Sequence, residues 1–259
     1  MSIDEETIDS LSTYVRRIEE LRATADAEFW YRGVKRASYP LKPTLFRHTK
    51  YKKIGEITEL EKNLYNEFCF QSPSFVSVSL QGAWDTLFLM QHYRIPTRLL
   101  DWTLNPFAAL FFAIDGHNGK DDAAVWLLKP KEWNRGVLSD IGGPAQIYNT
   151  DEEILNQYHP HLAGSTRRSE PLAIDGIINN ARINAQKGKF IVFGHKNEPL
   201  EEFHERVDDW HSTPLIKLRI PAKNVNEISQ LVFECGITHT SLFPDLEGLA
   251  MEIRHKYGF

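Results

Sequence analysis

The chain has 259 residues, of which 42% are hydrophobic and 25% charged, and its formal net charge is −5. This is the composition of a globular protein with enough apolar residues for a sizeable core. The longest apolar run, residues 107–114, is too short to span a bilayer, and the acidic N-terminal residues leave no apolar core for a signal peptide. These features exclude the integral membrane class, and we expect a cytoplasmic protein with no membrane partner.

Hydrophobic periodicity predicts an amphipathic helix over residues 4–24 and an aromatic strand from Glu28 to Gly33. A later helix should start near Pro106, because proline fits a first helical turn. Further helices are predicted over residues 57–70, 82–93, 225–235 and 246–257. Further strands are predicted over residues 98–102, 123–128, 189–193 and 215–220. Short strands and separated helices without regular βαβ alternation indicate an α+β fold.

No low-complexity linker divides the chain. We therefore predict an N-terminal helix in residues 1–25 and a single domain in residues 26–259. An irregular insertion is expected at about residues 130–170, where Gly142-Gly143-Pro144 marks a loop or a lid.

Cysteine and histidine usage gives no sign of a metal site. Cys69 and Cys235 lie in apolar helical contexts and are predicted to be buried free thiols. The ten histidines are scattered without the spacing of metal ligands, so we predict that the protein uses no metal.

Basic residues are concentrated between Trp30 and Gly55, a stretch without any Asp or Glu. A local basic face can bind phosphate even on a protein whose net charge is negative. An ordinary solvated surface explains such a charge run equally well. The residues considered for contacts to nucleic acid are Lys35, Arg36, Arg47, Lys52 and Lys53.

The predicted strand Phe29-Trp30-Tyr31-Arg32-Gly33 carries one charge among aromatic residues. Strand alternation places Trp30 and Arg32 on the same side. An arginine in this position needs either an anionic ligand, which we favour as a phosphate, or an acidic partner such as Asp101. Gly33 allows a ligand or a second backbone to approach closely.

A second polar cluster lies where the strand at residues 98–102 meets the next helix. Asp101 and Thr103 end this strand beside a helix N-terminus, a natural place for anions and catalytic groups. The helix cap is either Asp101 or Asn105, of which Asn105 is better placed. The polar residues that flank the same strand are His92 and Arg98.

A third cluster contains Arg182 and Gln186, which are four residues apart and share one face of a predicted helix. An ordinary surface pair is the simpler interpretation. Phosphate-binding loops of the GxxxxGK[ST] or GxGxxG type and the GxSxG motif of hydrolases do not occur in the sequence.

Four motifs make the chain resemble the FRG domain family. They are Tyr31-Arg32-Gly33, the stretch from Gln91 to Ala113, Arg182 to Phe190, and Leu242 to Gly248. The second motif reads close to QHYGxPTRLLDWTxNPxxALFFA, with Arg94 where glycine is common. The resemblance implies a bacterial or phage context near defence or toxin–antitoxin genes.

The order of these motifs is also similar to that of ADP-ribosyltransferases, whose first strand ends Tyr-Arg-Gly and binds NAD. This similarity implies a split mixed and antiparallel sheet surrounded by helices. Asp101 and Thr103 would replace two serines of the second element, and Gln186 would stand where a catalytic glutamate is usual. Glu247 is the second candidate for this glutamate. The predicted catalytic residues are Arg32, Asp101, Thr103 and Gln186. The residues that the resemblance places around NAD are Tyr31, Arg32, Gly33, His92, Tyr93, Arg98, Trp102, Asn105 and Arg182.

The expected function is an NAD-dependent ADP-ribosyltransferase that modifies a nucleic acid, with RNA favoured, in a bacterial toxin or antiphage effector. NAD would be its substrate, and a toxin of this kind implies an antitoxin protein as partner. The alternatives are a non-catalytic module that binds nucleic acid or nucleotides, and an NAD glycohydrolase.

Overall fold

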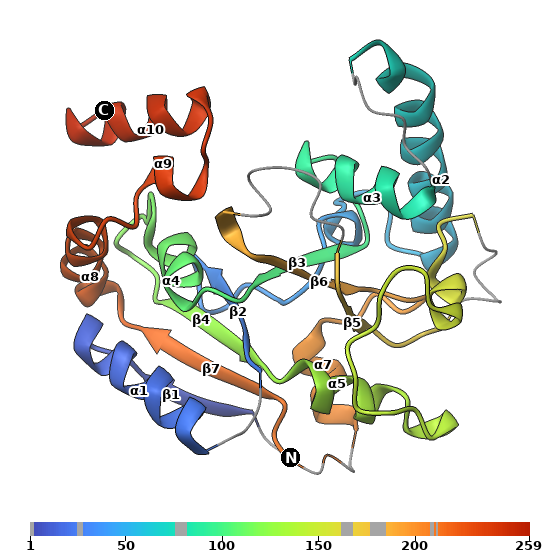
Figure 1. Ribbon diagram of the computed structural model, residues 1–259, viewed down its shortest axis with the longest axis horizontal. Coiled ribbons are helices and arrows are strands. Elements are labelled where there is room, and N and C mark those ends of the chain that lie inside the picture. Colours follow the sequence, from blue (N-terminus) through green and yellow to red (C-terminus); the bar gives the residue numbers. More distant parts are fainter. Residues whose placement is uncertain are drawn as a thin grey trace.

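The computed structural model describes residues 3–24, 28–75, 82–161, 168–176, 185–207, 210 and 212–259. Within them, seven strands form one mixed sheet in the order β1-β7-β4-β2-β3-β6-β5 (Figure 1). The strands are β1 Asp4–Thr7, β2 Trp30–Val34, β3 Leu99–Thr103, β4 Ala123–Leu128, β5 Leu172–Ile174, β6 Gly188–Val192 and β7 Leu215–Ile220. Only β1 and β7 pair in parallel, and every other neighbouring pair is antiparallel. The α+β prediction is confirmed.

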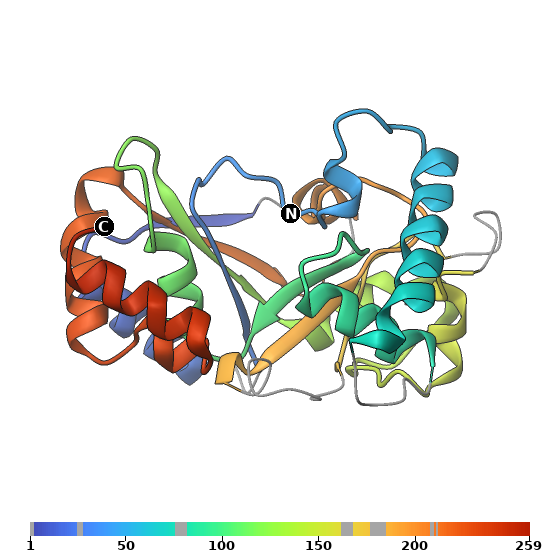
Figure 2. The same ribbon diagram turned by 90° about the horizontal axis from the view of Figure 1, so that it is seen from above.

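The sheet is nearly divided between β2 and β3. These strands share the single residue pair Tyr31 with Thr103, whereas β2 pairs with β4 over five residues and β3 pairs with β6 over five. Figure 2 shows the two strands diverging from their common point. The sheet therefore consists of a four-stranded part, β1-β7-β4-β2, and a three-stranded part, β3-β6-β5, joined by one pair.

Helices cover both parts of the sheet. Helices α1, α4 and α8 pack with the four-stranded part, and α2 and α3 stand beside the three-stranded part (Figure 1). The α-helices are α1 Leu11–Thr24, α2 Ile54–Gln71, α3 Ala83–His92, α4 Pro106–Ile114, α5 Pro130–Val137, α7 Leu200–Arg206, α8 Ala222–Glu234, α9 His239–Leu242 and α10 Leu246–Lys256. Short 3-10 helices occupy Leu45–Arg47, Ser72–Ser74, Ser139–Ile141 and Glu153–Tyr158.

Helix α4 begins and packs as its sequence predicts. The Asn105 side-chain oxygen accepts hydrogen bonds from the backbone N–H groups of Phe107 at 3.0 Å and Ala108 at 3.4 Å, so Asn105 is the N-cap. Pro106 follows at the first position, where its missing N–H costs nothing. Most of the helix is buried, which explains why its sequence is apolar on every face.

The predicted helix over residues 4–24 is wrong at its start. Residues 4–7 form β1, and the helix begins at Leu11 because the Ser10 hydroxyl accepts a hydrogen bond from the Thr13 N–H at 3.2 Å. The segment expected to be irregular, residues 130–170, contains helix α5 and two 3-10 helices. Cys69 and Cys235 are free as predicted, but both are exposed, because Cys69 faces solvent from α2 and Cys235 follows the end of α8.

In the described part of the chain, no helix is long and apolar enough to cross a membrane. Those residues also contain no group of three or more His, Cys, Asp or Glu side chains arranged to hold a metal ion.

Candidate functional site

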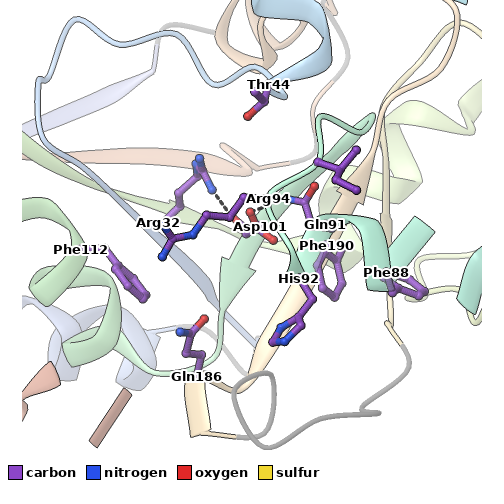
Figure 3. Close-up of a pocket in the computed structure, with 11 residues that line it drawn as sticks. Arg32, Thr44, Phe88, Gln91, His92, Arg94, Asp101, Phe112, Gln186 and Phe190 are labelled. Carbon is purple, nitrogen blue, oxygen red and sulfur yellow. Dashed lines mark hydrogen bonds between the residues drawn. The ribbon is translucent and has the colours of Figure 1, made fainter. Parts of the chain in front are cut away.

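A pocket of about 280 Å³ opens at the division between β2 and β3 (Figure 3). It combines residues from the middle of β2 and β3, from α3 and the turn after it, from α4, and from β6 and the segment before it, together with Thr44. Its lining residues are Arg32, Thr44, Phe88, Gln91, His92, Arg94, Ile95, Asp101, Phe112, Gln186 and Phe190. A smaller hollow of about 60 Å³ shares Arg32, Asp101, Phe112 and Gln186 with it and extends to Tyr31, Gly33, Trp102 and Thr103. The motifs singled out in the sequence therefore meet at one place.

Arg32 spans the division in the sheet. Its guanidinium donates a hydrogen bond to the main-chain carbonyl of Asp101 on β3, which is drawn as a dashed line in Figure 3. The Arg32 Nε is buried and has no hydrogen-bond partner among the described residues. Burial lowers the pKa of Arg32 from its usual value, the Asp101 carboxylate opposes this effect, and the nearby Arg47 adds to it. Two neighbouring cations and an unused donor make this end of the pocket suitable for an anion.

A chain of hydrogen bonds holds the Asp101 carboxylate. The Gln91 amide nitrogen donates to Asp101 Oδ2 at 2.7 Å, and the Gln91 amide oxygen accepts from the Thr97 hydroxyl at 2.5 Å. The Thr97 oxygen in turn accepts from the Leu99 backbone N–H at 3.1 Å. The carboxylate is exposed to the pocket, yet its orientation is set by the start of β3. Sequence reasoning did not single out Gln91 or Thr97, although both lie in the motif that contains Asp101.

Gln186 is fixed by a contact from a distant part of the chain. Its amide nitrogen donates to the Leu242 carbonyl at 3.1 Å, at the end of α9, and its side chain lines the pocket (Figure 3). With the nitrogen used in this way, the amide oxygen is the group available as an acceptor. Thr103 is nearly buried, and its hydroxyl donates to the Gln186 backbone carbonyl and accepts from the Asn105 N–H at 2.9 Å. Thr103 therefore positions Gln186, because both functions of its hydroxyl are used by the backbone.

Glycine is required at position 33 by the close approach of a second backbone, which is one of the two uses considered for it. A Cβ at this position would lie 1.9 Å from the Ala109 carbonyl oxygen and 2.6 Å from the Ala113 nitrogen, both in α4. Tyr31 is fully buried among the residues under α4, and burial raises the pKa of its phenol. Tyr31 and Gly33 therefore shape the site by packing α4 against β2.

Two of the residues predicted to bind the ligand, Arg98 and Asn105, instead have structural roles in the fold. Arg98 is 1% exposed, and its guanidinium binds the equally buried carboxylate of Glu61, with an Nε–Oε1 distance of 2.5 Å. A ligand cannot reach it, so its assignment to the NAD site is wrong. Asn105 has a structural role, because its side-chain oxygen caps α4 and is not available to a ligand.

The other predicted ligand residues differ in position. Trp102 is nearly buried and only borders the smaller hollow, His92 lines the pocket, and Tyr93 lies in a neighbouring groove. Arg182 lies outside the described residues.

The predicted basic residues are all exposed but do not form one uniform face. Arg36 pairs with Asp121 at 3.0 Å, while Arg47 lies close enough to Arg32 to lower its pKa. Lys35 follows β2, and Lys52 and Lys53 precede α2. The Arg47 guanidinium donates a hydrogen bond at 2.9 Å to the hydroxyl of Thr44, which lines the pocket, so Arg47 lies beside the pocket.

Comparison with known families matches one segment of the chain. Residues 27–122 match the model of the FRG domain. The chain carries an FRG domain. The matched segment contains the first two motifs, from Tyr31 to Gly33 and from Gln91 to Ala113, so the FRG domain supplies Arg32, Gln91 and Asp101.

Gln186 and its anchor Leu242 lie beyond the matched FRG segment. The pocket is therefore built by the FRG domain together with the C-terminal half of the chain. No curated protein and no solved structure matches the chain.

Proposed function

We propose that the protein is an NAD-dependent ADP-ribosyltransferase that modifies a nucleic acid, with RNA as the favoured acceptor. The observation that carries this proposal is Arg32: a half-buried guanidinium with an unused Nε donor, next to a second cation, at the mouth of a divided sheet. Such a group suits a diphosphate, which offers several anionic oxygens. The division between β2 and β3 also supports an ADP-ribosyltransferase-like fold.

The remaining lining residues suit the other parts of NAD. The rings of Phe88, Phe112 and Phe190 offer apolar surface for the nicotinamide. Asp101 is the carboxylate among the described lining residues, and its negative charge stabilises the positive charge that develops on the ribose. The Gln186 amide oxygen accepts a hydrogen bond from a ribose hydroxyl.

In the proposed reaction, the bond between ribose C1′ and the nicotinamide nitrogen breaks, and its electron pair leaves with nicotinamide. A nucleophilic atom of the acceptor then forms the new bond to C1′. Its proton passes to the Asp101 carboxylate and from there to solvent. Gln186 is neutral and cannot take this proton, so the departure from the usual glutamate gives the basic role to Asp101.

The basic residue Arg47 and the exposed Arg94 favour a nucleic-acid acceptor, because both add positive charge around the pocket mouth. A toxin or antiphage effector held in check by an antitoxin protein is the biological setting that we propose. The second candidates are an NAD glycohydrolase, in which water takes the place of the acceptor, and a binding module without turnover.

The decisive experiment incubates the purified protein with NAD labelled in its adenylate half and with separate pools of RNA, single-stranded DNA and protein. We expect label in the RNA pool and release of nicotinamide. Release without transfer to any pool would indicate the glycohydrolase. Absence of both would contradict the enzyme and leave the binding module.

Replacing Arg32 with alanine should lower the rate of nicotinamide release by about 100-fold, because the phosphates lose their preorganised donor. Arg32→Lys keeps the charge but not the planar fork, so it should recover only part of this loss. The measurement is kcat/KM for NAD. A rate within twofold of wild type in Arg32→Ala would show that the site is assigned wrongly.

Replacing Gln91 with leucine should lower kcat about tenfold and change KM less than twofold, because Asp101 loses the donor that orients it. Gln230→Leu is a matched control, since Gln230 is exposed on α8 and bonds only to Glu234 among the interactions described. A change confined to KM would indicate that Gln91 binds NAD instead of positioning Asp101.

A further inference from the structure

A second hollow begins where the site pocket ends. This groove, between α2 and the turn after α3, has a volume of about 730 Å³ and a mainly apolar lining. Arg94 and Ile95 line both the groove and the site pocket, so the two lie next to each other. We call it the aromatic groove; its lining residues are Leu64, Glu67, Phe68, Gln71, Ser72, Phe75, Tyr93, Arg94, Ile95 and Pro96.

Two rings of this groove are presented to solvent. Phe75 is 86% exposed and Tyr93 is 60% exposed. The Tyr93 ring contacts the ring of His92 edge-on, with centroids 4.8 Å apart, and His92 belongs to the site pocket. Exposed rings beside a polar pocket offer flat surfaces for stacking.

Arg94 stands at the junction in a conformation that the fold does not favour. Its φ of 62° lies in the left-handed region, which is unfavourable for a residue with a side chain. Its ion pair with Glu247 is 3.6 Å long, and both side chains are 61% exposed. Such an exposed pair stabilises the fold little and does not offset the unfavourable backbone conformation. Stability therefore does not explain a guanidinium at this point.

We propose that the aromatic groove is the subsite for a base of the nucleic-acid acceptor, and that Arg94 binds the phosphate connecting that base to the nucleotide in the site pocket. The inference rests on the proposed function, since it names where the acceptor lies. A base stacks on Tyr93 and Phe75, a contact that tolerates any base because each has a π-face. The strand then passes Arg94 into the pocket, where the reacting nucleotide meets the ribose of NAD.

The polar residues of the groove lining favour a base over an apolar peptide side chain. Gln71 and Glu67 belong to this lining, and the Gln71 amide nitrogen donates to the Glu67 carboxylate at 3.0 Å. An amide and a carboxylate are groups that read the donors and acceptors on base edges. Together with the Arg94 guanidinium and the exposed rings of the same lining, these groups match the parts of a nucleotide.

The test measures binding of a labelled single-stranded RNA of twelve nucleotides by fluorescence anisotropy at several salt concentrations. Tyr93→Ala and Phe75→Ala should each weaken binding about tenfold, which is the loss of one stacked base. Arg94→Gly should weaken binding and reduce the salt slope by about one phosphate contact. Phe70→Ala and Tyr257→Ala are the matched controls; these aromatic residues are 88% and 69% exposed outside the groove and should bind as wild type does.

The Arg94→Gly variant should unfold at no lower denaturant concentration than wild type, because glycine relaxes the left-handed backbone. Loss of RNA binding in this variant is therefore a loss of contact and not of fold. Transfer of ADP-ribose to RNA should fall in the groove variants relative to nicotinamide release.

The outcomes separate this inference from the proposed function. Groove-dependent RNA binding without any turnover of NAD would support the subsite and contradict the transferase. Turnover with full RNA binding and transfer in Tyr93→Ala and Phe75→Ala would overturn the subsite. A wild-type dimer that Tyr93→Ala converts to a monomer would overturn it as well, because the groove would then be an interface between copies of the chain.

Discussion

Replacing Glu61 with alanine should lower the free energy of unfolding by about 3–5 kcal/mol, because it leaves the Arg98 guanidinium charged and buried without its counterion. Glu61 and Arg98 are each 1% exposed, so water cannot take over the role of the lost partner. The remaining acceptors are the carbonyl oxygens of Tyr158 and Phe193, at 3.3 and 3.4 Å from Arg98 Nη1, and these are neutral. The measurement is denaturant unfolding followed by circular dichroism.

The double variant Glu61→Leu with Arg98→Met distinguishes charge from packing. Removing both charges should recover most of the loss, since a buried ion pair contributes little net stability over apolar residues of similar volume. If Glu61→Ala cost less than 1 kcal/mol, or if the double variant were less stable than the single one, the pair would have to be solvated or otherwise compensated.

Replacing Gly33 with alanine should lower the free energy of unfolding by about 3 kcal/mol. The added Cβ would lie 1.9 Å from a carbonyl oxygen in the backbone of α4, and a buried helix backbone cannot move aside without losing its own packing. The φ of Gly33 is outside the left-handed region, so the cost is steric and not conformational. Thermal or denaturant unfolding measures it directly.

Gly55→Ala provides the matched control for Gly33→Ala. Gly55 lies in the first turn of α2, and a Cβ there would meet nothing within 4 Å. This substitution should stabilise the protein by about 0.5–1 kcal/mol through the lower entropy of the unfolded chain. Equal effects of the two substitutions would contradict the close approach of β2 and α4.

The parts of the fold that were predictable are those set by neighbours in sequence. The start of α4 followed from Asn105 and Pro106, and the buried strand at residues 123–128 followed from its apolar run. Strand β1 could not be predicted in this way. Its residues are polar and largely exposed, and it belongs to the sheet through backbone pairing with β7, some 210 residues later.

The site shows the same division between local and long-range information. The motifs pointed to Arg32, Asp101 and Gln186, and the structure brings these residues together in the lining of one pocket although they lie far apart in the sequence. They also pointed to Arg98, whose partner Glu61 lies 37 residues away and gives no local sign of an ion pair. A charged residue in a motif can serve the core as well as a ligand, and only its surroundings distinguish the two.

The single residue pair that joins β2 to β3 has a mechanical consequence. A sheet resists bending through its ladder of backbone bonds, so its stiffness is lowest where the ladder is reduced to Tyr31 and Thr103. Arg32 adds a side-chain connection between β2 and β3, because its guanidinium donates a hydrogen bond to the Asp101 carbonyl on the other strand. A ligand that binds Arg32 and Asp101 together would add a further connection between β2 and β3 where the two strands share only one residue pair. Ligand binding in the pocket would then stiffen both parts of the sheet, including strands that the ligand does not contact.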